Sequence, residues 1–543
     1  MRPVLSFALP VLMLACHAAL AAAAPGQATN NTTAPATLVL EETDVATLQS
    51  QMSGGKLTSH QLTQAYLDRI AAIDDAGPML NSVIDINPDA LKEADARDKE
   101  RKAGKVRGPM HGIPVLLKDN IDVTPMVNSA GSLALAENYP KTDAFLVRKL
   151  RESGAVVLGK TNLSEWANFR STRSISGWSG RGGQTKNPYA LDRNPCGSSS
   201  GTGSAISASL AAVGIGTETD GSIICPSSVA GLVGLKPTIG LVSRSGVIPI
   251  AASQDTAGPM TRTVADAAAL LTAIAGYDKA DSGAAGSGDR PKVDYLAHLK
   301  KDALRGARIG VLREKDGINP AVDRQFEQAV ATLKAAGATV VDAEIPTDGQ
   351  WGEYEGELLA YEFKDGVNKY LAGANAPVKT LADLIEFNKK HATAEMPYFD
   401  QERFEQAQAK GTLDEPAYKE ARDKAKRLAG AEGVDAALRA QNLDALVAVA
   451  MAPAWVTDVV LNDHGIGGGG YGVAAVAGTP SLTVPMGESF GLPFGIVFMG
   501  PAWSEARLIE LGYSFEQLTH ARKAPRFLPT VDAKAFPRAS GGE

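Results

Sequence analysis

Cysteine is scarce in this 543-residue sequence: it has three, and only Cys196 and Cys225 lie beyond the first 24 residues. That count excludes a scaffold held together by several disulfides. A single bridge between these two residues is open, but the sequence favours two small buried thiols. No spacing of cysteine and histidine resembles a metal site, and we expect neither a metal nor a cofactor.

Excess charge is also low, because the formal net charge of the whole chain is −7. The sequence therefore gives no reason to expect nucleic acid or an anionic membrane as a partner. Hydrophobic residues make up 44% and charged residues 21%, which is typical of a soluble globular protein. We interpret residues 41–530 as one domain followed by a tail at 531–543, and we expect a monomer.

Long apolar runs are missing except at the N-terminus, where Val4–Leu14 follows Arg2 and precedes an alanine-rich stretch. This order is typical of a secretory signal, and the run is too short to cross a bilayer. We therefore expect a signal peptide at 1–24, a flexible tether at 25–40 and a periplasmic or secreted protein without membrane attachment after cleavage. Cys16 leaves a lipoprotein cleavage site open as an alternative.

Short apolar runs alternate with helical patterns along the rest of the chain. This alternation predicts an α/β fold in which helices cover both faces of a mixed central sheet. The expected strands lie at 82–86, 113–117, 155–158, 231–235, 308–312, 339–343, 445–449, 481–484 and 495–499. The expected helices lie at 41–74 (two helices, with Ser59 as a cap), 88–105, 143–152 and 205–215, and a charged helical insertion at 350–440 would shape a substrate entrance.

The string Gly154–Thr161 fits the phosphate-loop pattern GxxxxGK[ST]. In a true phosphate loop a strand precedes the first glycine, whereas here the four variable residues are themselves the apolar strand. The residues before Gly154 are typical of a helix that ends in a glycine cap. A nucleotide-binding protein is therefore only a remote alternative.

The string Gly465–Gly470 fits the dinucleotide pattern GxGxxG, but five glycines in six residues match such a pattern easily. A dinucleotide site also needs a surrounding βαβ unit, and the sequence gives no convincing one. We interpret this string as a glycine-rich loop that lines a pocket.

The string Gly197–Gly201 fits the nucleophile elbow GxSxG, which would make Ser199 a nucleophile. The elbow needs a strand directly before it, and prolines and turn residues occupy that stretch instead. A triad would also need His464 or His520 as its base. His111 lies upstream of the serines and is typical of a structural histidine, so a serine–histidine hydrolase is disfavoured.

Lys118 is the remaining candidate for a catalytic base, because it directly follows the apolar run 112–117. A lysine at the end of a strand usually lies at the surface. Burial would instead lower its pKa from about 10.4 by up to roughly 3–5 units. A neutral amine can then accept a proton from a serine, as in serine–lysine variants of nucleophilic catalysis.

Several segments together resemble the amidase signature family, the serine hydrolases that include fatty acid amide hydrolase and the glutamyl-tRNA amidotransferase A subunit. The matching segments span residues 40–520 and lie at 112–119, 159–162, 187–188, 197–201, 216–222, 231–237, 255–262 and 478–485. Within the family, the segments 165–170 and 218–223 most resemble the bacterial peptide amidases. The resemblance implies the amidase signature fold.

The resemblance also implies a Ser-Ser-Lys triad. Ser222 would be the nucleophile, Lys118 the base, and Ser198 the relay that passes a proton between them. The family places a non-proline cis peptide bond before the relay serine, here Gly197–Ser198. Backbone N–H groups would form the oxyanion hole at Thr219, Asp220 and Gly221.

Two positions depart from the family pattern. Asp220 replaces a glycine in the oxyanion loop, so its side chain must point away from the developing negative charge. Ile224 replaces the arginine of the amidotransferase type, which removes a candidate partner for a substrate carboxylate. The second difference, together with the predicted export, favours a small or peptidic neutral amide, and Asn168 is a candidate substrate-binding residue.

The sequence thus predicts an exported amidase that converts the C-terminal carboxamide of peptides to the free acid and ammonia. The reaction would pass through an acyl-enzyme on Ser222. Within the same class, a general acylamide or aryl-acylamide hydrolase is the alternative.

Overall fold

A computed structural model describes residues 38–284, 288, 290–313, 319–465 and 467–535. The expected signal peptide, the alternative cleavage site at Cys16, most of the tether and most of the C-terminal tail lie outside these residues. From Leu40 onward the described residues form one compact unit.

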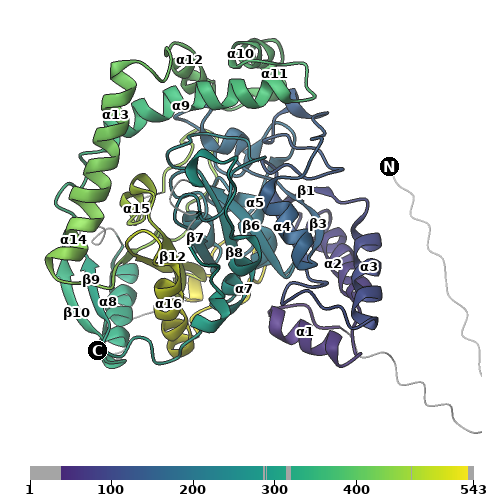
Figure 1. Cartoon of the computed structure of the whole chain (residues 1–543), viewed down its shortest axis with the longest axis vertical. Helices are drawn as coiled ribbons and strands as arrows, with labels where there is room; N and C mark the ends of the chain where they lie inside the picture. Colours follow the sequence, from purple (N-terminus) through teal and green to yellow (C-terminus); the bar gives the residue numbers. More distant parts are fainter. Residues whose placement is uncertain (1–37, 285–287, 289, 314–318, 466, 536–543) are drawn as a thin grey trace, which may run out of the picture. The chain divides into compact units, whose positions relative to one another are not determined.

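A mixed sheet of eleven strands is the centre of this unit (Figure 1), in the order β1-β3-β2-β6-β8-β7-β12-β13-β11-β9-β10. The pairs β3–β2, β2–β6, β11–β9 and β9–β10 are parallel, and the other pairs are antiparallel. The strands are β1 (Val83–Ile86), β2 (Pro114–Lys118), β3 (Val156–Thr161), β6 (Val213–Glu218), β7 (Val233–Lys236), β8 (Thr256–Thr261), β9 (Arg308–Leu312), β10 (Thr339–Ala343), β11 (Ala445–Val449), β12 (Ser481–Ser489) and β13 (Leu492–Met499). The short strands β4 (Trp178–Ser179) and β5 (Gly183–Gln184) form a separate hairpin.

Helices surround the sheet, which confirms the predicted fold class. They are α1 (Val45–Ser53), α2 (Ser59–Ile73), α3 (Ala90–Lys102), α4 (Phe145–Ser153), α5 (Ser200–Ser207), α6 (Ile224–Val229), α7 (Val264–Ile274), α8 (Pro320–Ala335), α9 (Gly352–Gly373), α10 (Leu381–Lys390), α11 (Ala392–Glu395), α12 (Glu402–Gln408), α13 (Pro416–Lys426), α14 (Asp435–Ala440), α15 (Gly472–Ala477) and α16 (Glu505–Thr519). Helices α4, α7, α16 and α8 contact one another in series, and α7, α16 and α8 pack on central strands. A second group, α5 and α6, packs on the same strands and carries part of the site described below.

The predicted helix over 205–215 is wrong. Helix α5 ends at Ser207, the chain turns through Ser209 in a left-handed conformation (φ 55°), and β6 begins at Val213. Both segments are fully buried, so an apolar run gives no period by which a helix can be told from a strand. Strand β8 was not predicted either, because its sequence contains Gly258 and Pro259, which argue against a strand.

The predicted cap of α2 is displaced by one residue. The N-cap is Thr58, whose hydroxyl accepts a hydrogen bond from the N–H of Gln61, and the Gln61 side chain returns a bond to the Thr58 N–H. This reciprocal capping box needs a glutamine or glutamate three residues after the cap, which Thr58 has.

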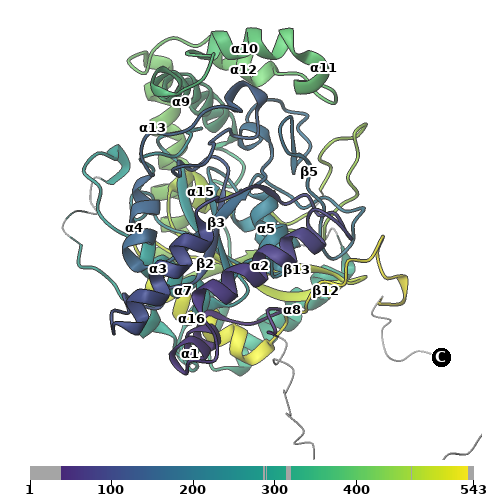
Figure 2. The same cartoon turned by 90° about the vertical axis from the view of Figure 1, so that its right-hand side faces the viewer.

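The charged region at 350–440 is helical, as predicted, and spans α9 to α14 (Figures 1 and 2). Helices α12 and α13 both pack on α9, and α10 packs on α12. Glu355 on α9 accepts a hydrogen bond of 2.9 Å from Gln254, which lies just before the central strand β8. No helix among the described residues is both long and apolar enough to span a bilayer.

Candidate active site

The site begins where two parallel neighbours in the sheet end. Strands β2 and β6 pair in parallel with Leu117 opposite Ile215, so Lys118 and Thr217 emerge side by side at the same edge. Loops at the carboxyl ends of parallel strands commonly hold ligands in open α/β sheets.

Lys118 is fully buried and points along this edge toward hydroxyl groups. Its Nζ donates hydrogen bonds to Ser198 Oγ (2.7 Å), Thr217 Oγ1 (2.9 Å) and the Thr217 carbonyl (3.2 Å). Burial lowers the pKa of Lys118 to about 7, against the opposing effect of the Asp255 and Glu218 carboxylates. Near pH 7 Lys118 is therefore neutral in about half of the molecules, and a neutral amine can accept a proton.

Ser198 connects the lysine to the second serine. Its Oγ donates a hydrogen bond of 3.0 Å to Ser222 Oγ, and the N–H of Ser199 donates to the Ser222 carbonyl at 3.2 Å. The peptide bond Gly197–Ser198 is cis, as the resemblance implied. The structure thus brings Lys118, Ser198 and Ser222 together in one continuous hydrogen-bonded chain.

Residues from other segments hold the loop that precedes Ser222. Thr219 Oγ1 donates to Asp255 Oδ1 at 2.5 Å, and Gln254 Nε2 donates to the Thr219 carbonyl at 3.3 Å. Gly221 has a left-handed conformation (φ 78°), and a β-carbon there would collide with the ring of Tyr471. These contacts fix the backbone of Thr219, Asp220 and Gly221, the residues predicted to form the oxyanion hole.

Glu218 lies beneath this loop, at the end of β6. One carboxylate oxygen accepts the N–H groups of Ile223 (2.7 Å) and Ile224 (3.0 Å). Burial raises the pKa of Glu218, while the Lys236 ammonium and these N–H groups, with that of Gly221, lower it. Glu218 therefore holds the first turn after Ser222.

Asp220 is the one exposed residue between positions 194 and 238. Its carboxylate lies beside Gly472 at the start of α15, where an added β-carbon would stand 3.9 Å from Asp220 Oδ1. The surrounding protein and the carboxylates of Glu355 and Glu218 raise the pKa of Asp220 well above its usual value, although contact with solvent screens this shift.

Asn168 lies at the end of a short helical turn, in a left-handed conformation (φ 69°). Its Nδ2 donates to Ser176 Oγ at 2.9 Å, whereas its Oδ1 is buried and has no hydrogen-bond partner. Ser176 in turn donates to Asp463 Oδ2 at 2.5 Å. The Nδ2 of Asn168 thus fixes the side chain, and its Oδ1 is free to accept a hydrogen bond from another donor.

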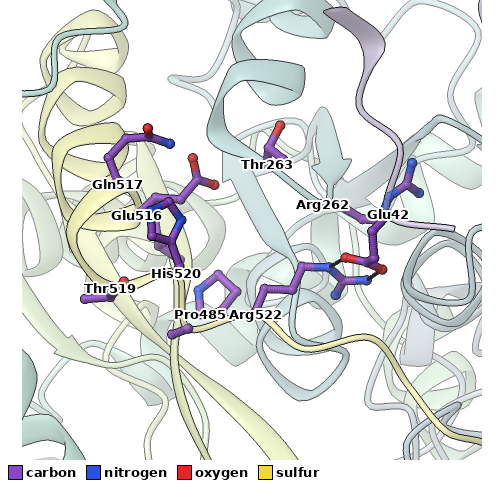
Figure 3. Close-up of a pocket in the computed structure, with 11 residues that line it drawn as sticks. Glu42, Arg262, Thr263, Pro485, Glu516, Gln517, Thr519, His520 and Arg522 are labelled. Atoms are coloured by element: carbon purple, nitrogen blue, oxygen red, sulfur yellow. Dashed lines mark hydrogen bonds and ion pairs between the residues drawn. The ribbon is translucent and has the colours of Figure 1, made fainter. Parts of the chain in front are cut away.

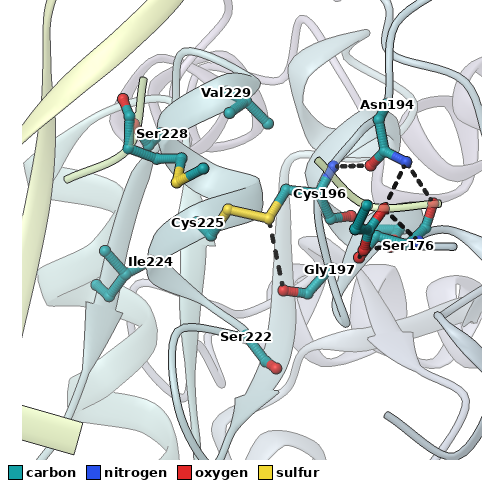
Figure 4. The surroundings of a disulfide bond; sticks show 12 residues. Ser176, Asn194, Cys196, Gly197, Ser222, Ile224, Cys225, Ser228 and Val229 are labelled. Atoms are coloured by element: carbon teal, nitrogen blue, oxygen red, sulfur yellow. Dashed lines mark hydrogen bonds between the residues drawn. A yellow bond between two sulfur atoms is a disulfide. The ribbon is translucent and has the colours of Figure 1, made fainter. Parts of the chain in front are cut away.

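Cys196 and Cys225 form a disulfide (Figure 4), so the expectation of two free thiols is wrong. The residues are 29 apart in sequence, but their Cα atoms lie 6.1 Å apart, within the range that a disulfide bridges. The turn from α5 into β6 and from β6 into α6 brings the two cysteines together. Sequence spacing carries no information about that approach.

Lys160, the lysine of the phosphate-loop string, is buried and fully occupied by protein groups. Its Nζ donates to the Ile121 carbonyl at 2.7 Å and forms an ion pair with Asp119 Oδ1 at 3.0 Å. Gly154 ends α4 in a left-handed conformation (φ 83°), and Lys160 lies inside strand β3. This arrangement leaves no phosphate-binding loop in the segment.

The structure also lacks the features that a nucleophile elbow at Ser199 would need. Ser199 Oγ donates to the Thr217 carbonyl at 3.1 Å, and no strand directly precedes it. His111 is buried against the Arg97 carbonyl, and His464 Nδ1 lies 2.8 Å from the Asn462 carbonyl. The glycine-rich string 465–470, described except at 466, leads into Tyr471 beside Gly221.

His520 lines a separate pocket of about 200 Å³ (Figure 3). There Arg522 donates to both carboxylate oxygens of Glu42, each at 2.8 Å. None of Lys118, Ser198 and Ser222 lines this pocket. Among the described residues, no group of three or more His, Cys, Asp or Glu side chains could hold a metal ion.

Sequence reasoning missed two groups that hold the site. Thr217 accepts hydrogen bonds from the Lys118 amine through both its hydroxyl and its carbonyl oxygen. Asp255 accepts a hydrogen bond from Thr219 and also the N–H groups of Ile250 (2.8 Å) and Ala251 (2.9 Å). Both residues lie in segments that carry the family resemblance. Only the pairing of β2 with β6, and of β6 with β8, shows what they contact.

Comparison with known proteins gives the same family throughout. A family model described as amidase matches residues 61–509. A probable amidase of Arabidopsis thaliana is 39% identical over 505 residues, which cover 91% of this chain and 93% of the relative. A putative amidase of Schizosaccharomyces pombe is 36% identical over 532 residues, with 92% and 89% covered.

Solved structures agree with these sequence relatives. The native peptide amidase of Stenotrophomonas maltophilia has a TM-score of 0.86 and 57% identity, covering 90% of this chain and 99% of that one. A peptide amidase in complex with the competitive inhibitor chymostatin has a TM-score of 0.88 and 57% identity, covering 89% and 99%. With its mixed sheet, its cis Gly197–Ser198 bond and its buried lysine, the chain belongs to the amidase signature family of hydrolases.

Proposed function

We propose that this amidase hydrolyses the C-terminal carboxamide of peptides to the free acid and ammonia. The observation that carries the proposal is the hydrogen-bonded chain from Lys118 Nζ through Ser198 Oγ to Ser222 Oγ, at 2.7 and 3.0 Å. It gives a proton on Ser222 a direct path to a buried amine. Ser222, Ser198 and Lys118 act as nucleophile, relay and base.

In the first step Ser222 Oγ attacks the amide carbonyl carbon. Its proton passes to Ser198, whose own proton passes to Lys118, so the lysine ends as an ammonium. The carbonyl oxygen becomes negative and is stabilised by backbone N–H groups of the loop at Thr219–Gly221. The proton then returns through Ser198 to the departing nitrogen, the C–N bond breaks and ammonia leaves.

In the second step a water molecule takes the place of the ammonia. Lys118, neutral again, accepts a proton from that water through Ser198, and the resulting hydroxide attacks the acyl carbon. The ester bond to Ser222 breaks and Ser222 recovers its proton. One amide and one water thus yield one acid and one ammonia, without a cofactor in either step.

The peptidic substrate is supported by the 57% identity to peptide amidase over 90% of this chain. It is also supported by the character of position 224, because Ile224 is fully buried and offers no charge to a substrate carboxylate. A general acylamide or aryl-acylamide would use the same chemistry. Asn168, with its unpartnered Oδ1, is the proposed contact to an N–H donor of the substrate.

We further propose that the protein is exported and acts as a monomer. The disulfide between Cys196 and Cys225 supports export, because such bonds persist in oxidising compartments and are rare in the cytosol. The N-terminal sequence pattern supports it independently.

The test is ammonia release from a blocked dipeptide amide, with the blocked dipeptide acid and an aryl acylamide beside it. The wild type should release ammonia from the amide, and Ser222→Ala and Lys118→Ala should lose activity by a factor of roughly 10³ or more. Ser199→Ala is the matched control and should stay active. Full activity in Ser222→Ala would contradict the assignment of Ser222 as the nucleophile. If only the aryl acylamide is hydrolysed, the substrate is an aryl acylamide and not a peptide amide.

A further inference from the structure

The disulfide joins the two chain segments that carry the proposed catalytic serines. Cys196 directly precedes the cis bond Gly197–Ser198, and Cys225 lies in the first turn after Ser222. Figure 4 shows the sulfur–sulfur bond between these segments, with Gly197 and Ser222 both lying below it in this view. No other covalent link connects the two segments among the described residues except the main chain through α5 and β6.

Noncovalent contacts also hold the two segments together. They include the hydrogen bond of 3.0 Å from Ser198 Oγ to Ser222 Oγ, the bond of 3.2 Å from the Ser199 N–H to the Ser222 carbonyl, and the packing of α5 on α6. Single hydrogen bonds contribute little net stability, since water replaces them when they break. A proton relay nevertheless needs its two oxygens within about 3 Å of each other throughout turnover.

Each cysteine lies two or three residues from its serine, and neighbouring residues hold its backbone. The Cys196 N–H donates to Asn194 Oδ1 at 2.8 Å, and Ser200 Oγ donates to the Cys196 carbonyl at 2.6 Å. The Cys225 N–H donates to the Gly221 carbonyl at 2.8 Å. A shift of either sulfur is therefore passed to the backbone of the relay serine or of the nucleophile.

The bond is also enclosed. Cys196 is 7% exposed and Cys225 is 2% exposed, in a cluster with Val229, Met451 and Ala454. Trp455 and Tyr471 pack against the same cluster, and Tyr471 also contacts Gly221 of the oxyanion loop. The disulfide thus lies at the point where the relay segment, the nucleophile segment and the oxyanion loop meet.

We propose that the Cys196–Cys225 disulfide is a positioning element of the active site, which keeps Ser198 Oγ within hydrogen-bonding distance of Ser222 Oγ. The inference rests on the proposed function of these serines. A dithiol reductant would break the bond: two electrons and two protons pass to the cysteines, two thiols form, and the reductant becomes a disulfide. Amide turnover then falls while substrate binding and the fold persist.

The experiment compares the oxidised wild type, the wild type reduced with dithiothreitol, and the double variant Cys196→Ala/Cys225→Ala. Met451→Ala is the matched control, because it removes packing around the bond and leaves the bond in place. Reduction is verified by thiol titration, and all rates are measured well below each protein's unfolding temperature. The readouts are kcat, KM and the rate at which a fluorophosphonate probe labels Ser222.

Reduced wild type and the double variant should both lose roughly 10- to 100-fold in kcat and in the labelling rate, with KM unchanged. Met451→Ala should keep both rates, dithiothreitol should not affect the double variant further, and reoxidation should restore the wild type. A reduced, folded wild type with full kcat would overturn the proposal, even if its unfolding temperature fell. If the oxidised wild type hydrolyses no amide, the proposed function fails instead.

Discussion

The side-chain nitrogen of Lys118 lies 2.7 Å from Ser198 Oγ, although 80 residues separate the two in sequence. Strand β2 brings the lysine to the edge of the sheet, and the segment that leads into α5 places the serine hydroxyl there. Burial at this point lowers the pKa of the lysine to about 7. The contact holds the lysine in place, and once the amine is neutral the Ser198 hydroxyl lies where it can donate its proton to it.

The first prediction concerns the pH dependence of the reaction. Because Lys118 must be neutral to act as a base, kcat/KM should rise with pH, reach half of its plateau near pH 7 and stay level above pH 8. Initial rates of ammonia release between pH 5 and 9 measure the profile. A midpoint near the ordinary lysine value, about 10.4, would contradict the assignment.

The second prediction isolates Thr217. Its Oγ1 accepts a hydrogen bond of 2.9 Å from Lys118 and so favours the charged amine. Thr217→Val should shift the midpoint of the pH profile to lower pH and reduce the plateau of kcat roughly 10- to 100-fold. Thr217→Ser keeps the hydroxyl and should retain the wild-type midpoint. An upward shift in the valine variant would show that the hydroxyl does not stabilise the ammonium.

The third prediction separates stability from nucleotide binding. Lys160 and Asp119 form a fully buried ion pair at 3.0 Å, so Lys160→Ala removes the nearer cation and leaves this buried carboxylate with Arg181 at 3.6 Å. The free energy of unfolding should fall by about 3–5 kcal/mol, measured by urea titration. Adding Asp119→Asn should recover part of this loss. Calorimetry should find no ATP binding in the wild type, and saturable ATP binding lost in Lys160→Ala would revive the phosphate-loop hypothesis.

The fourth prediction concerns Glu516 in the pocket of Figure 3. Its carboxylate accepts the N–H of Val264 at 2.8 Å, and burial raises its pKa from 4.5 to about 7. The folded protein holds this proton more tightly than the unfolded chain does. Its contribution to stability is therefore fully present below pH 4.5 and is lost as the pH rises through 7.

Glu516→Gln keeps an acceptor for Val264 but cannot ionise. Between pH 5 and pH 8 the free energy of unfolding of the wild type should fall by about 2 kcal/mol relative to the variant. Urea titrations of both proteins at the two pH values measure this difference. Parallel pH dependence in the two proteins would mean that Glu516 titrates as an ordinary exposed carboxyl.

Much of the sheet followed from local pattern. The runs at 308–312, 339–343 and 445–449 coincide with β9, β10 and β11, because buried strands bounded by turn residues leave a short apolar signature. The prediction for 205–215 was wrong, because a small buried helix and a buried strand share that signature. The sequence also identified the family and proposed Lys118, Ser198 and Ser222, because the matching segments are long and keep their order.

Tertiary structure alone decided the pKa of Lys118 and the pairing of the two cysteines. The pairing of β2 with β6 buries Lys118 against Thr217, and desolvation there lowers its pKa by an amount that no local pattern encodes. The approach of Cys196 to Cys225 depends on how α5, β6 and α6 fold back together, so their disulfide was not evident from spacing. Distance along the chain constrains local structure, whereas these two properties depend on which distant segments meet.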